Sequence, residues 1–506
     1  KMDYLVPGWH QLLNDWAYTV PMVEFDDAVS HLQILRDDQQ PAGLIVTDYQ
    51  PQLSSKLNQF SLAPTKVFAA FDYLQGVEHS DSRVVDYRDL AWPADALFDM
   101  TPFRLQVVSQ GRKYAQVIFD NQGKVLWIDY FQADGQRNRR LLLDSRGFVS
   151  REEEYTDGQL RGFSYFDEQS HWRFRQDQQT GRVTINPDLP RFTKQLAYDQ
   201  LSDLITEVVR EHFLPQLKAT DRLIVSLDDQ QPVASQVFAQ QDRVVFSASR
   251  WHPYRQTLAK IATQKPLLIA DAQATAEEVQ QLGYLPEPPA IIPIFQAQFK
   301  LGHSQRSLRQ RIAVFCENTA HDELARIVEL LYQLLLKDPD ELAVDYLTYS
   351  PEKEQEVRQL VDDLTDRHPG EFEFKPDKPD QNENERDLKE KALPQLEIKT
   401  VRLTSTSAVL KALDKTRIMV DWGTKIDQFM QIAVISVGIP QIRQAPTEML
   451  QSGKNGLVET DLDKLPAGLN YYLQSLRHWN AALANNVQYL NQYSEENLLK
   501  KWQEIL

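Results

Sequence analysis

The sequence predicts an α/β protein with two parallel-sheet domains, the first of which carries an inserted antiparallel sheet. Strand-like hydrophobic runs alternate with helical segments over residues 1–100 and 190–300, and again over residues 301–474. Such alternation places helices on both faces of a parallel sheet. Residues 101–189 instead contain short strand-like runs separated by turns, which is typical of an antiparallel meander. The length of 506 residues also favours more than one domain, because a single core rarely grows beyond about 250–300 residues.

Net charge, cysteine content and hydropathy exclude several classes of protein. The formal net charge is −17, which argues against a nucleic-acid-binding protein because such proteins concentrate basic residues on one face. Cys316 is the only cysteine; it excludes a disulfide framework, and its apolar neighbours predict a buried, unreactive thiol. No apolar run approaches the ~18 residues of a transmembrane helix, and the sequence starts without a signal-peptide pattern. We therefore expect a cytoplasmic protein, or one that its partners hold at the inner face of the membrane.

The boundaries of the predicted domains are visible in the sequence. The first domain is expected to begin with a strand within residues 3–9, which breaks at a Pro-Gly pair and leaves Trp9 and His10 on the next loop. Because the loops after parallel strands line the binding crevice of an α/β sheet, these two residues are candidates for a cleft. The proline-rich residues 286–293 are interpreted as the hinge between the two parallel-sheet domains.

Regularly spaced glycines mark the turns of the inserted sheet. Gly111, Gly123, Gly135, Gly147 and Gly158 lie twelve, twelve, twelve and eleven residues apart, with strand-like runs between them. This pattern predicts consecutive antiparallel hairpins. The runs carry aromatic and charged residues on both faces, so the sheet is expected to be solvated and to project from its domain. Such a surface could also dock a protein or peptide, and the sequence leaves both interpretations open.

Two pairs of aspartates suggest catalysis or metal binding at first sight. Asp26 and Asp27 precede a helical run over residues 28–37, so either carboxylate can cap that helix; a catalytic carboxylate pair is the alternative. Asp461 and Asp463 could hold a metal ion, but they too precede a helical run, which favours capping. The sequence contains no P-loop, G-x-S-x-G elbow, H-E-x-x-H or paired Cys-x-x-Cys motif. It therefore assigns no catalytic residue and no metal ligand, and it predicts no cofactor.

The stretch Arg417–Ile442 organises the second parallel-sheet domain. A buried strand is expected to end at Asp421, a helical run follows, and Gly438 provides a natural C-terminal cap before Pro440 introduces the next strand. Together with residues 453–458, GKNGLV, this unit resembles the part of the GT-B glycosyltransferases that lies beneath a donor sugar. The resemblance implies a GT-B-like architecture, with two Rossmann-type domains facing a cleft.

This copy of the donor-binding unit lacks the expected charged residues. In retaining GT-B enzymes two glutamates, eight residues apart, contact the donor, and the corresponding positions here are Lys425 and Ala433. Those enzymes also place a basic pair after the first strand of this domain, where residues 317–322 are acidic or neutral. The resemblance therefore implies a retained scaffold with eroded chemistry. The residues expected to line this vestigial donor cleft are Asp421, Trp422, Lys425, Asp427, Gln428, Gly438, Pro440, Asn455 and Gly456.

A narrower resemblance covers both ends of the chain. Residues 3–9, 24–36, 431–442 and 453–473 resemble the first of the three accessory secretory protein families of the accessory Sec system of Gram-positive bacteria. The resemblance implies a non-enzymatic component that acts with two sibling accessory secretory proteins and an accessory SecA-type motor to export a serine-rich-repeat glycoprotein adhesin. The insert also resembles a sheet domain of the glycosyltransferases that modify such adhesins. Residues 475–506 are expected to form helices that pack back across the domains.

Two other functions are compatible with the sequence. The first is an active retaining glycosyltransferase that modifies Ser or Thr of the adhesin, with Asp421, Asp427 or Gln428 replacing the missing glutamates. The second is a sugar-binding module that keeps the old cleft, where Trp422 and the two aromatic residues of the first loop supply stacking and hydrogen bonds. The lysine and alanine at the glutamate positions disfavour the enzyme.

Overall fold

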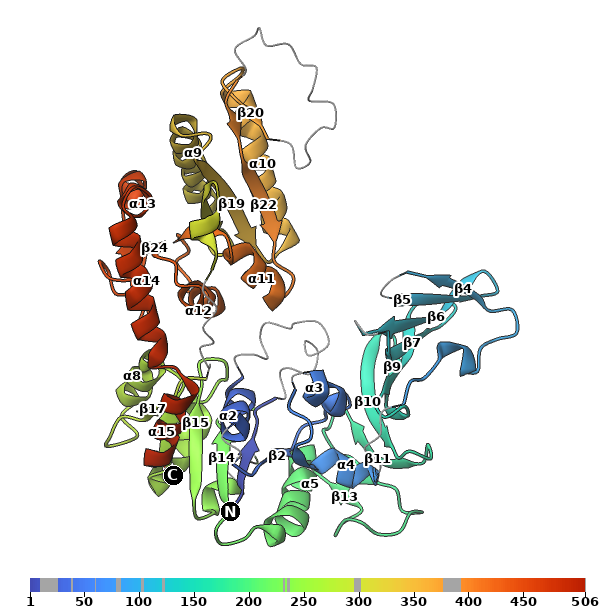
Figure 1. Ribbon diagram of the computed structural model, residues 1–506. Coiled ribbons are helices and arrows are strands. Elements are labelled where there is room, and N and C mark those ends of the chain that lie inside the picture. The colour runs from blue at the N-terminus through green and yellow to red at the C-terminus, as the bar shows by residue number, and fades with distance from the viewer. Residues whose placement is uncertain are drawn as a thin grey trace. The chain divides into compact units, whose positions relative to one another are not determined.

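The chain folds into two units, each built on its own parallel sheet (Figure 1). The structure, a computed structural model, describes residues 1–9, 26–37, 40–59, 61–78, 83–101, 104–120, 123–230, 233, 237–294, 302–375 and 393–505. The first unit comprises Lys1–Ile294 with Ile505–Leu506, and the second comprises Phe295–Glu504.

A seven-stranded parallel sheet forms the centre of the first unit, with the order β17-β16-β15-β14-β1-β2-β3. From β1 the chain proceeds to β2 and β3, whereas from β14 it proceeds the other way, so the order reverses between β1 and β14. Ligands of such sheets bind at the carboxyl ends of the strands beside this switch point. The strands are β1 Asp3–Val6, β2 Ala42–Val46, β3 Lys66–Ala69, β14 Arg222–Ser226, β15 Val244–Ala248, β16 Leu267–Ala270 and β17 Ala290–Ile291. The helices are α2 Asp27–Asp37, α3 Leu53–Gln59, α4 Ala70–Gln75, α5 Leu201–Val208, α7 Arg255–Ile261 and α8 Gln273–Gln281.

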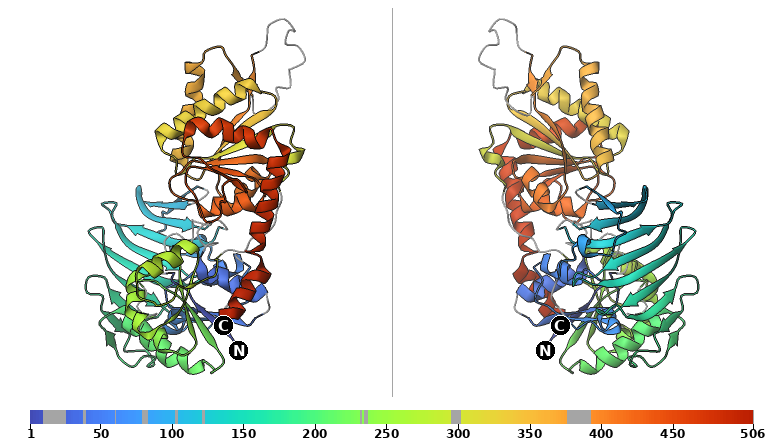
Figure 2. Two further views of the ribbon diagram at one scale, coloured as in Figure 1. Left: turned by 90° about the vertical axis from the view of Figure 1, so that its left-hand side faces the viewer. Right: turned by 90° about the vertical axis from the view of Figure 1, so that its right-hand side faces the viewer.

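The insert of the first unit is a ten-stranded antiparallel sheet in which β4 to β13 pair in sequence order. Figure 2 shows these strands as one twisted ladder. The five glycines of the predicted turns all have positive φ angles, from 71° to 90°, a conformation that glycine adopts without steric cost. The predicted hairpins are confirmed. The strands are β4 Leu97–Met100, β5 Arg104–Ser109, β6 Arg112–Phe119, β7 Val125–Phe131, β8 Arg137–Leu143, β9 Val149–Thr156, β10 Gln159–Phe166, β11 Trp172–Asp177, β12 Val183–Ile185 and β13 Ala197–Tyr198.

The expectation that both faces of the insert are solvated is wrong in two places. On β5 and β6, Leu105 and Val117 are fully buried in a cluster that also contains apolar residues of the segment 85–96. At the other end of the sheet, Tyr165 stacks on Phe174 with ring centroids 4.3 Å apart, and both belong to the hydrophobic core of the parallel sheet. The alternating charges in the sequence did not show that other segments of the same unit cover these apolar positions.

The second unit contains a six-stranded parallel sheet with the order β22-β19-β18-β23-β24-β25. Its strands are β18 Gln310–Phe315, β19 Leu342–Thr348, β22 Ile398–Arg402, β23 Thr416–Asp421, β24 Gln441–Arg443 and β25 Gly456–Val458, and a separate pair is β20 Glu373–Phe374 with β21 Gln395–Leu396. The helices are α9 His321–Lys337, α10 Pro351–Arg367, α11 Thr406–Leu413, α12 Gln428–Ser436, α13 Leu465–Leu473, α14 Leu476–Asn491 and α15 Glu495–Ile505. Two parallel sheets with helices and an inserted antiparallel sheet confirm the predicted fold class.

The C-terminal helices begin with α14, which is bound to its own unit. The indole of Trp479 donates to the carbonyl oxygen of Arg417 at 2.8 Å, and the amide of Asn486 donates to that of Ile439 at 3.0 Å. Packing of these helices back across the domains remains a prediction. No helix in the described part of the chain combines the length and apolar character needed to traverse a bilayer.

Candidate functional site

A buried ion pair closes the carboxyl edge of the second unit's sheet. Asp421 ends β23, and its register partner Arg443 ends β24. Nη1 of Arg443 donates to Oδ2 of Asp421, and the two side chains are only 1% and 2% exposed. Burial raises the pKa of Asp421, while the positive charge of Arg443 acts in the opposite direction. The one carboxylate that the sequence placed at the end of β23 is thus occupied by the protein itself.

The start of α12 and the preceding loop carry Lys425, Asp427 and Gln428 of the expected cleft residues, and Ala433 lies further along the helix. Asp427 caps the helix, because its Oδ1 accepts a hydrogen bond from the backbone N–H of Met430 at 2.7 Å. Gln428 is 5% exposed, and neither atom of its amide makes a hydrogen bond. Lys425 is exposed on the loop, and Ala433 lies in a hydrophobic core. The two glutamate positions therefore hold a solvated cation and a core methyl group.

Glu317 occupies the region where a donor site would have basic residues. Its Oε2 accepts hydrogen bonds from Oγ1 of Thr348 at 2.6 Å and from the backbone N–H of Tyr349 at 2.8 Å. Partial burial raises the pKa of Glu317, but these hydrogen bonds outweigh burial and lower it overall. The nearby ammonium of Lys353 is held by Glu356 at 2.8 Å. A diphosphate would therefore meet an anionic carboxylate here instead of a cation.

The remaining expected residues of the second unit maintain the fold. Gly438 has φ 81° after the end of α12, and the carbonyl oxygen of Pro440 accepts a hydrogen bond from β23 at 3.0 Å. Both amide atoms of Asn455 bond the backbone of its own loop, at 2.8 and 2.9 Å. A Cβ atom on Gly456 would lie 2.2 Å from the carbonyl oxygen of Gln441, so only glycine lets β24 and β25 pair this closely.

The tryptophans proposed for sugar stacking are buried. Trp9 and Trp422 are each 1% exposed, so neither ring offers a face to solvent. This burial argues against a binding site that relies on these two residues. His10 lies outside the described residues.

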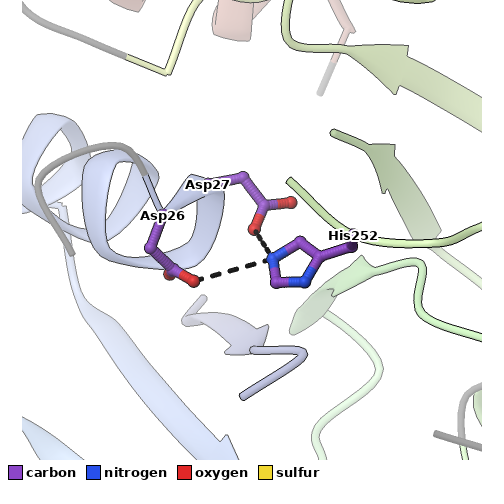
Figure 3. Close-up of side chains that lie close together, drawn as sticks. All are labelled: Asp26, Asp27 and His252. Atoms are coloured by element: carbon purple, nitrogen blue, oxygen red, sulfur yellow. Dashed lines mark ion pairs between the residues drawn. The ribbon is translucent and has the colours of Figure 1, made fainter. Parts of the chain in front are cut away.

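A buried cluster of carboxylates and one imidazole lies at the switch point of the first unit's sheet (Figure 3). His252 follows β15, and its Nδ1 lies 3.2 Å from Oδ2 of Asp228, which follows β14. Nε2 of the same ring lies 3.7 Å from Oδ2 of Asp26 and 3.6 Å from Oδ1 of Asp27. The four side chains are at most 5% exposed. The two aspartates come from the start of α2, so three segments distant in sequence meet here.

Local structure fixes each member of this cluster. Oδ1 of Asp26 accepts from the backbone N–H of Val29 at 2.9 Å, which confirms the predicted helix cap and leaves Oδ2 directed at His252. Oδ1 of Asp27 accepts from the hydroxyl of Ser226 at 2.8 Å. On the other side of the ring, a Cβ atom on Gly8 would lie only 3.1 Å from Cβ of Asp228. The Pro-Gly break after β1 therefore makes room for Asp228.

The electrostatics of the cluster couple the imidazole to its neighbours. Burial raises the pKa of Asp27, but the close approach of His252 and the positive charge of its imidazolium outweigh burial and hold this pKa at about 2. Burial lowers the pKa of His252, and the carboxylates of Asp228, Asp26 and Asp27 raise it well above its usual value. Three carboxylates around one imidazolium leave two negative charges without compensation, which is unfavourable in a buried site. The possible ligand atoms of Asp26, Asp27 and His252 all lie within 4.8 Å of one another.

Sequence reasoning missed Asp228, His252 and Arg443. Each follows or ends a strand at the carboxyl edge of a parallel sheet, the edge at which such sheets bind ligands. That position was a usable signal, because the apolar strand runs before these residues are plain in the sequence. Two smaller predictions are confirmed: Asp461 caps a short helix by accepting from the backbone N–H of Asp463 at 3.1 Å, and the thiol of Cys316 is fully buried.

Comparison with solved structures identifies the class of this fold. The pneumococcal O-GlcNAc transferase GtfA in complex with UDP and GlcNAc superposes with a TM-score of 0.66 and 12% identity, covering 99% of this chain and 98% of the transferase. TarM superposes with a TM-score of 0.60 and 11% identity, covering 100% and 98%. The protein thus has the fold of the GT-B glycosyltransferases.

The whole chain falls into one family within this class. The family model for accessory Sec system protein 1 matches residues 6–506, and the chain belongs to that family. The accessory Sec system protein 1 of Streptococcus gordonii is 25% identical over 525 residues, which cover 100% of this chain and 99% of the relative. A chain in the solved structure of the glycosylation-associated protein complex (Gap123) of Streptococcus agalactiae superposes with a TM-score of 0.84 and 23% identity, covering 100% of both chains. A chain in the structure of accessory secretory proteins 1, 2 and 3 in Streptococcus pneumoniae superposes with a TM-score of 0.81 and 22% identity, covering 100% of this chain and 98% of the other.

Proposed function

We propose that this protein is a non-enzymatic component of the accessory Sec export machinery, where it acts in a complex with accessory secretory proteins 2 and 3. The observation that carries the proposal is the family match over residues 6–506, in a chain whose Asp421, expected at the donor cleft, is held in a buried ion pair with Arg443. The similar structures from S. agalactiae and S. pneumoniae are themselves of multi-protein complexes. The proposal extends to a SecA-type motor and to a glycosylated serine-rich-repeat adhesin as the exported substrate.

The closed donor edge supports an adaptor rather than an enzyme. A nucleotide-sugar diphosphate needs cations or backbone donors to offset its charge. The guanidinium of Arg443 is paired with Asp421, Lys353 is paired with Glu356, and Glu317 adds a negative charge. Of the three side chains suggested as substitutes for the missing glutamates, Asp421 and Asp427 already serve an ion pair and a helix cap, and Gln428 is buried.

Co-purification tests the adaptor role. The full chain, expressed together with accessory secretory proteins 2 and 3 and carrying the only affinity tag, is expected to retain both partners through size-exclusion chromatography. Expression of the tagged chain with an unrelated GT-B transferase provides the control for non-specific association. Elution of the tagged chain without its siblings would contradict the proposal.

Calorimetric titration tests the absence of transferase chemistry. We expect no binding heat when UDP-GlcNAc is added to the full chain, because Arg443 and Lys353 are already paired with carboxylates and Glu317 adds a negative charge where a donor site would have basic residues. The transferase GtfA, whose solved complex contains UDP and GlcNAc, is the positive control. Micromolar binding accompanied by sugar transfer to a serine-rich peptide would establish the enzyme instead.

An open cavity in the first unit favours a second, compatible role in binding the sugar of the adhesin. The cavity has a volume of about 290 Å³ and lies between the end of β2 and the insert, where Tyr49, Phe163 and Tyr165 contribute rings and Asp48 and Arg151 contribute charge. Small-molecule sites are usually lined by aromatic and apolar side chains with a few polar groups. Phe163 contributes the accessible ring here, because Tyr49 and Tyr165 are only 4% and 2% exposed. We expect Phe163→Ser to weaken the binding of a GlcNAc-modified serine peptide about tenfold in NMR titrations, whereas Phe119→Ser, outside this cavity, leaves it unchanged.

A further inference from the structure

We propose that Asp26, Asp27 and His252 bind a divalent transition-metal ion, with Zn²⁺ as the best match, at the switch point of the first unit's sheet. This inference is independent of the export function and concerns a site distinct from the closed donor edge. It rests on the spacing of the ligand atoms, on the group behind the imidazole and on buried polar atoms that have no hydrogen-bond partner.

The spacing of the ligand atoms fits a small ion held between them. Nε2 of His252 lies 3.7 Å from Oδ2 of Asp26 and 3.6 Å from Oδ1 of Asp27. These separations are too long for hydrogen bonds. Tetrahedral Zn²⁺ with bonds of about 2.0 Å to nitrogen and oxygen sets its ligand atoms about 3.3 Å apart. The two separations from the imidazole exceed this value by a few tenths of an ångström, and all three ligand atoms lie within 4.8 Å of one another.

The imidazole is oriented as a metal ligand. Nδ1 of His252 lies 3.2 Å from Oδ2 of Asp228, which places the ring's other nitrogen, Nε2, toward Asp26 and Asp27 (Figure 3). A carboxylate beside the second nitrogen of a ligating histidine is common behind a zinc ion, because it can orient the ring and increase its basicity. Gly8 admits Asp228 to this position, since a Cβ atom there would crowd the carboxylate at 3.2 Å.

Buried polar atoms without hydrogen bonds point to the same ligand. Nε2 of His252 and Oδ2 of Asp26, which lie 3.7 Å apart, make no hydrogen bond, although their residues are only 7% and 3% exposed. Such atoms are costly to bury. A divalent cation bound to a neutral imidazole would satisfy them and reduce the two uncompensated negative charges to one. One nitrogen with oxygen ligands suits Zn²⁺ and neighbouring transition ions, whereas Mg²⁺ and Ca²⁺ prefer oxygen alone.

Metal analysis of the full chain is the first test. The protein is purified with its affinity tag removed, stripped with a chelator, and titrated with Zn²⁺, Mn²⁺ and Mg²⁺ in separate calorimetric experiments. We expect one equivalent of Zn²⁺ with micromolar or tighter affinity, weaker Mn²⁺ and no Mg²⁺. Absence of Zn²⁺ binding, or equal binding of Mg²⁺, would overturn the proposal.

Substitutions locate the ion. We expect His252→Gln and Asp27→Asn each to weaken Zn²⁺ binding at least tenfold, and Asp228→Asn to weaken it 10- to 100-fold through the orientation of the ring. The matched control is Asp463→Asn in the exposed carboxylate pair of the second unit, which should bind Zn²⁺ as the unmodified chain does. Unchanged affinity in all three site variants would refute the assignment.

X-ray absorption decides the matter if these variants do not fold. The Zn²⁺-loaded unmodified chain should show a four-coordinate shell of nitrogen and oxygen with a single imidazole. A spectrum with sulfur or with two or more imidazoles would place the ion elsewhere and overturn the proposal.

Discussion

The carboxyl edges of the two parallel sheets differ in how their buried charges are balanced. In the second unit, Asp421 and Arg443 form a one-to-one pair, so the edge is neutral and closed. In the first unit, Asp26, Asp27 and Asp228 surround the single imidazole of His252, so the edge keeps an excess of negative charge. The comparison teaches that buried charges at the carboxyl edge of a parallel sheet can be balanced by an internal counterion or left dependent on a proton or an added cation.

The largest expected effect comes from breaking the closed edge. Arg443→Met leaves the buried carboxylate of Asp421 without a counterion, which should lower the free energy of unfolding by about 3–5 kcal/mol. Urea denaturation of the full chain measures the change. Arg326→Met is the matched control, because its pair with Asp463 is 57% and 76% exposed and should contribute no more than about 1 kcal/mol. Equal effects of the two substitutions would show that burial does not distinguish the pairs.

The pairing of β24 with β25 behind the closed edge is the next most sensitive feature. A methyl group on Gly456 would lie 2.2 Å from a backbone oxygen of the neighbouring strand, so Gly456→Ala should cost about 2–3 kcal/mol in the same denaturation experiment. Gly453→Ala is the control in the same loop, because its methyl group would meet nothing within 4 Å. Because the φ angle of Gly453 is 81°, the control substitution should itself lower the free energy of unfolding by about 1 kcal/mol.

A pH dependence is expected for the first edge through His31 of α2. Burial lowers the pKa of His31 from 6.5 to about 4, although Asp27 acts in the opposite direction. Between these two values the unfolded chain binds a proton that the folded chain does not, so this residue makes the folded state less stable as the pH falls from 6.5 toward 4.

The variant His31→Leu isolates this contribution. Between pH 7 and pH 5, the free energy of unfolding of this variant should fall by about 2 kcal/mol less than that of the unmodified chain. Asp48 has a pKa raised to about 7 by burial and by Asp228, so it acts with the opposite sign, but it does so in both proteins and cancels in the difference. Identical pH profiles of the two proteins would contradict a neutral, buried His31.

The smallest effect is expected at Gly8, which makes room for the carboxylate of Asp228 in the first unit. Gly8→Ala would bring a methyl group to 3.1 Å from Cβ of Asp228 and 3.5 Å from Nδ1 of His252, a crowding that should cost about 1 kcal/mol. The substitution should also move the imidazole NMR signals of His252, whereas Gly456→Ala in the other unit should leave them in place. Unmoved signals in Gly8→Ala would show that Gly8 does not position the cluster.

Local patterns made much of the fold predictable. The glycine spacing identified the hairpins of the insert, and the Asp421, Gly438 and Pro440 signals located a strand, the end of a helix and the next strand correctly. Buried charges were not predictable in the same way. From the sequence alone, Arg443 would be expected on the surface, because nothing there indicates that it pairs with Asp421, 22 positions earlier in the chain. His252 belongs to a site only because the order of the strands brings three distant segments to one edge.

The position of β1 in the middle of its sheet has a consequence for synthesis. Asp3 of β1 is bonded by Arg222 of β14, 219 positions later, whereas each strand of the insert pairs with the next one along the chain. At about 5–20 residues per second, a ribosome would deliver β14 roughly 10–40 s after β1. During that interval the insert can form its hairpins one after another. The backbone donors and acceptors on the β14 side of β1 stay unpaired and accessible to chaperones.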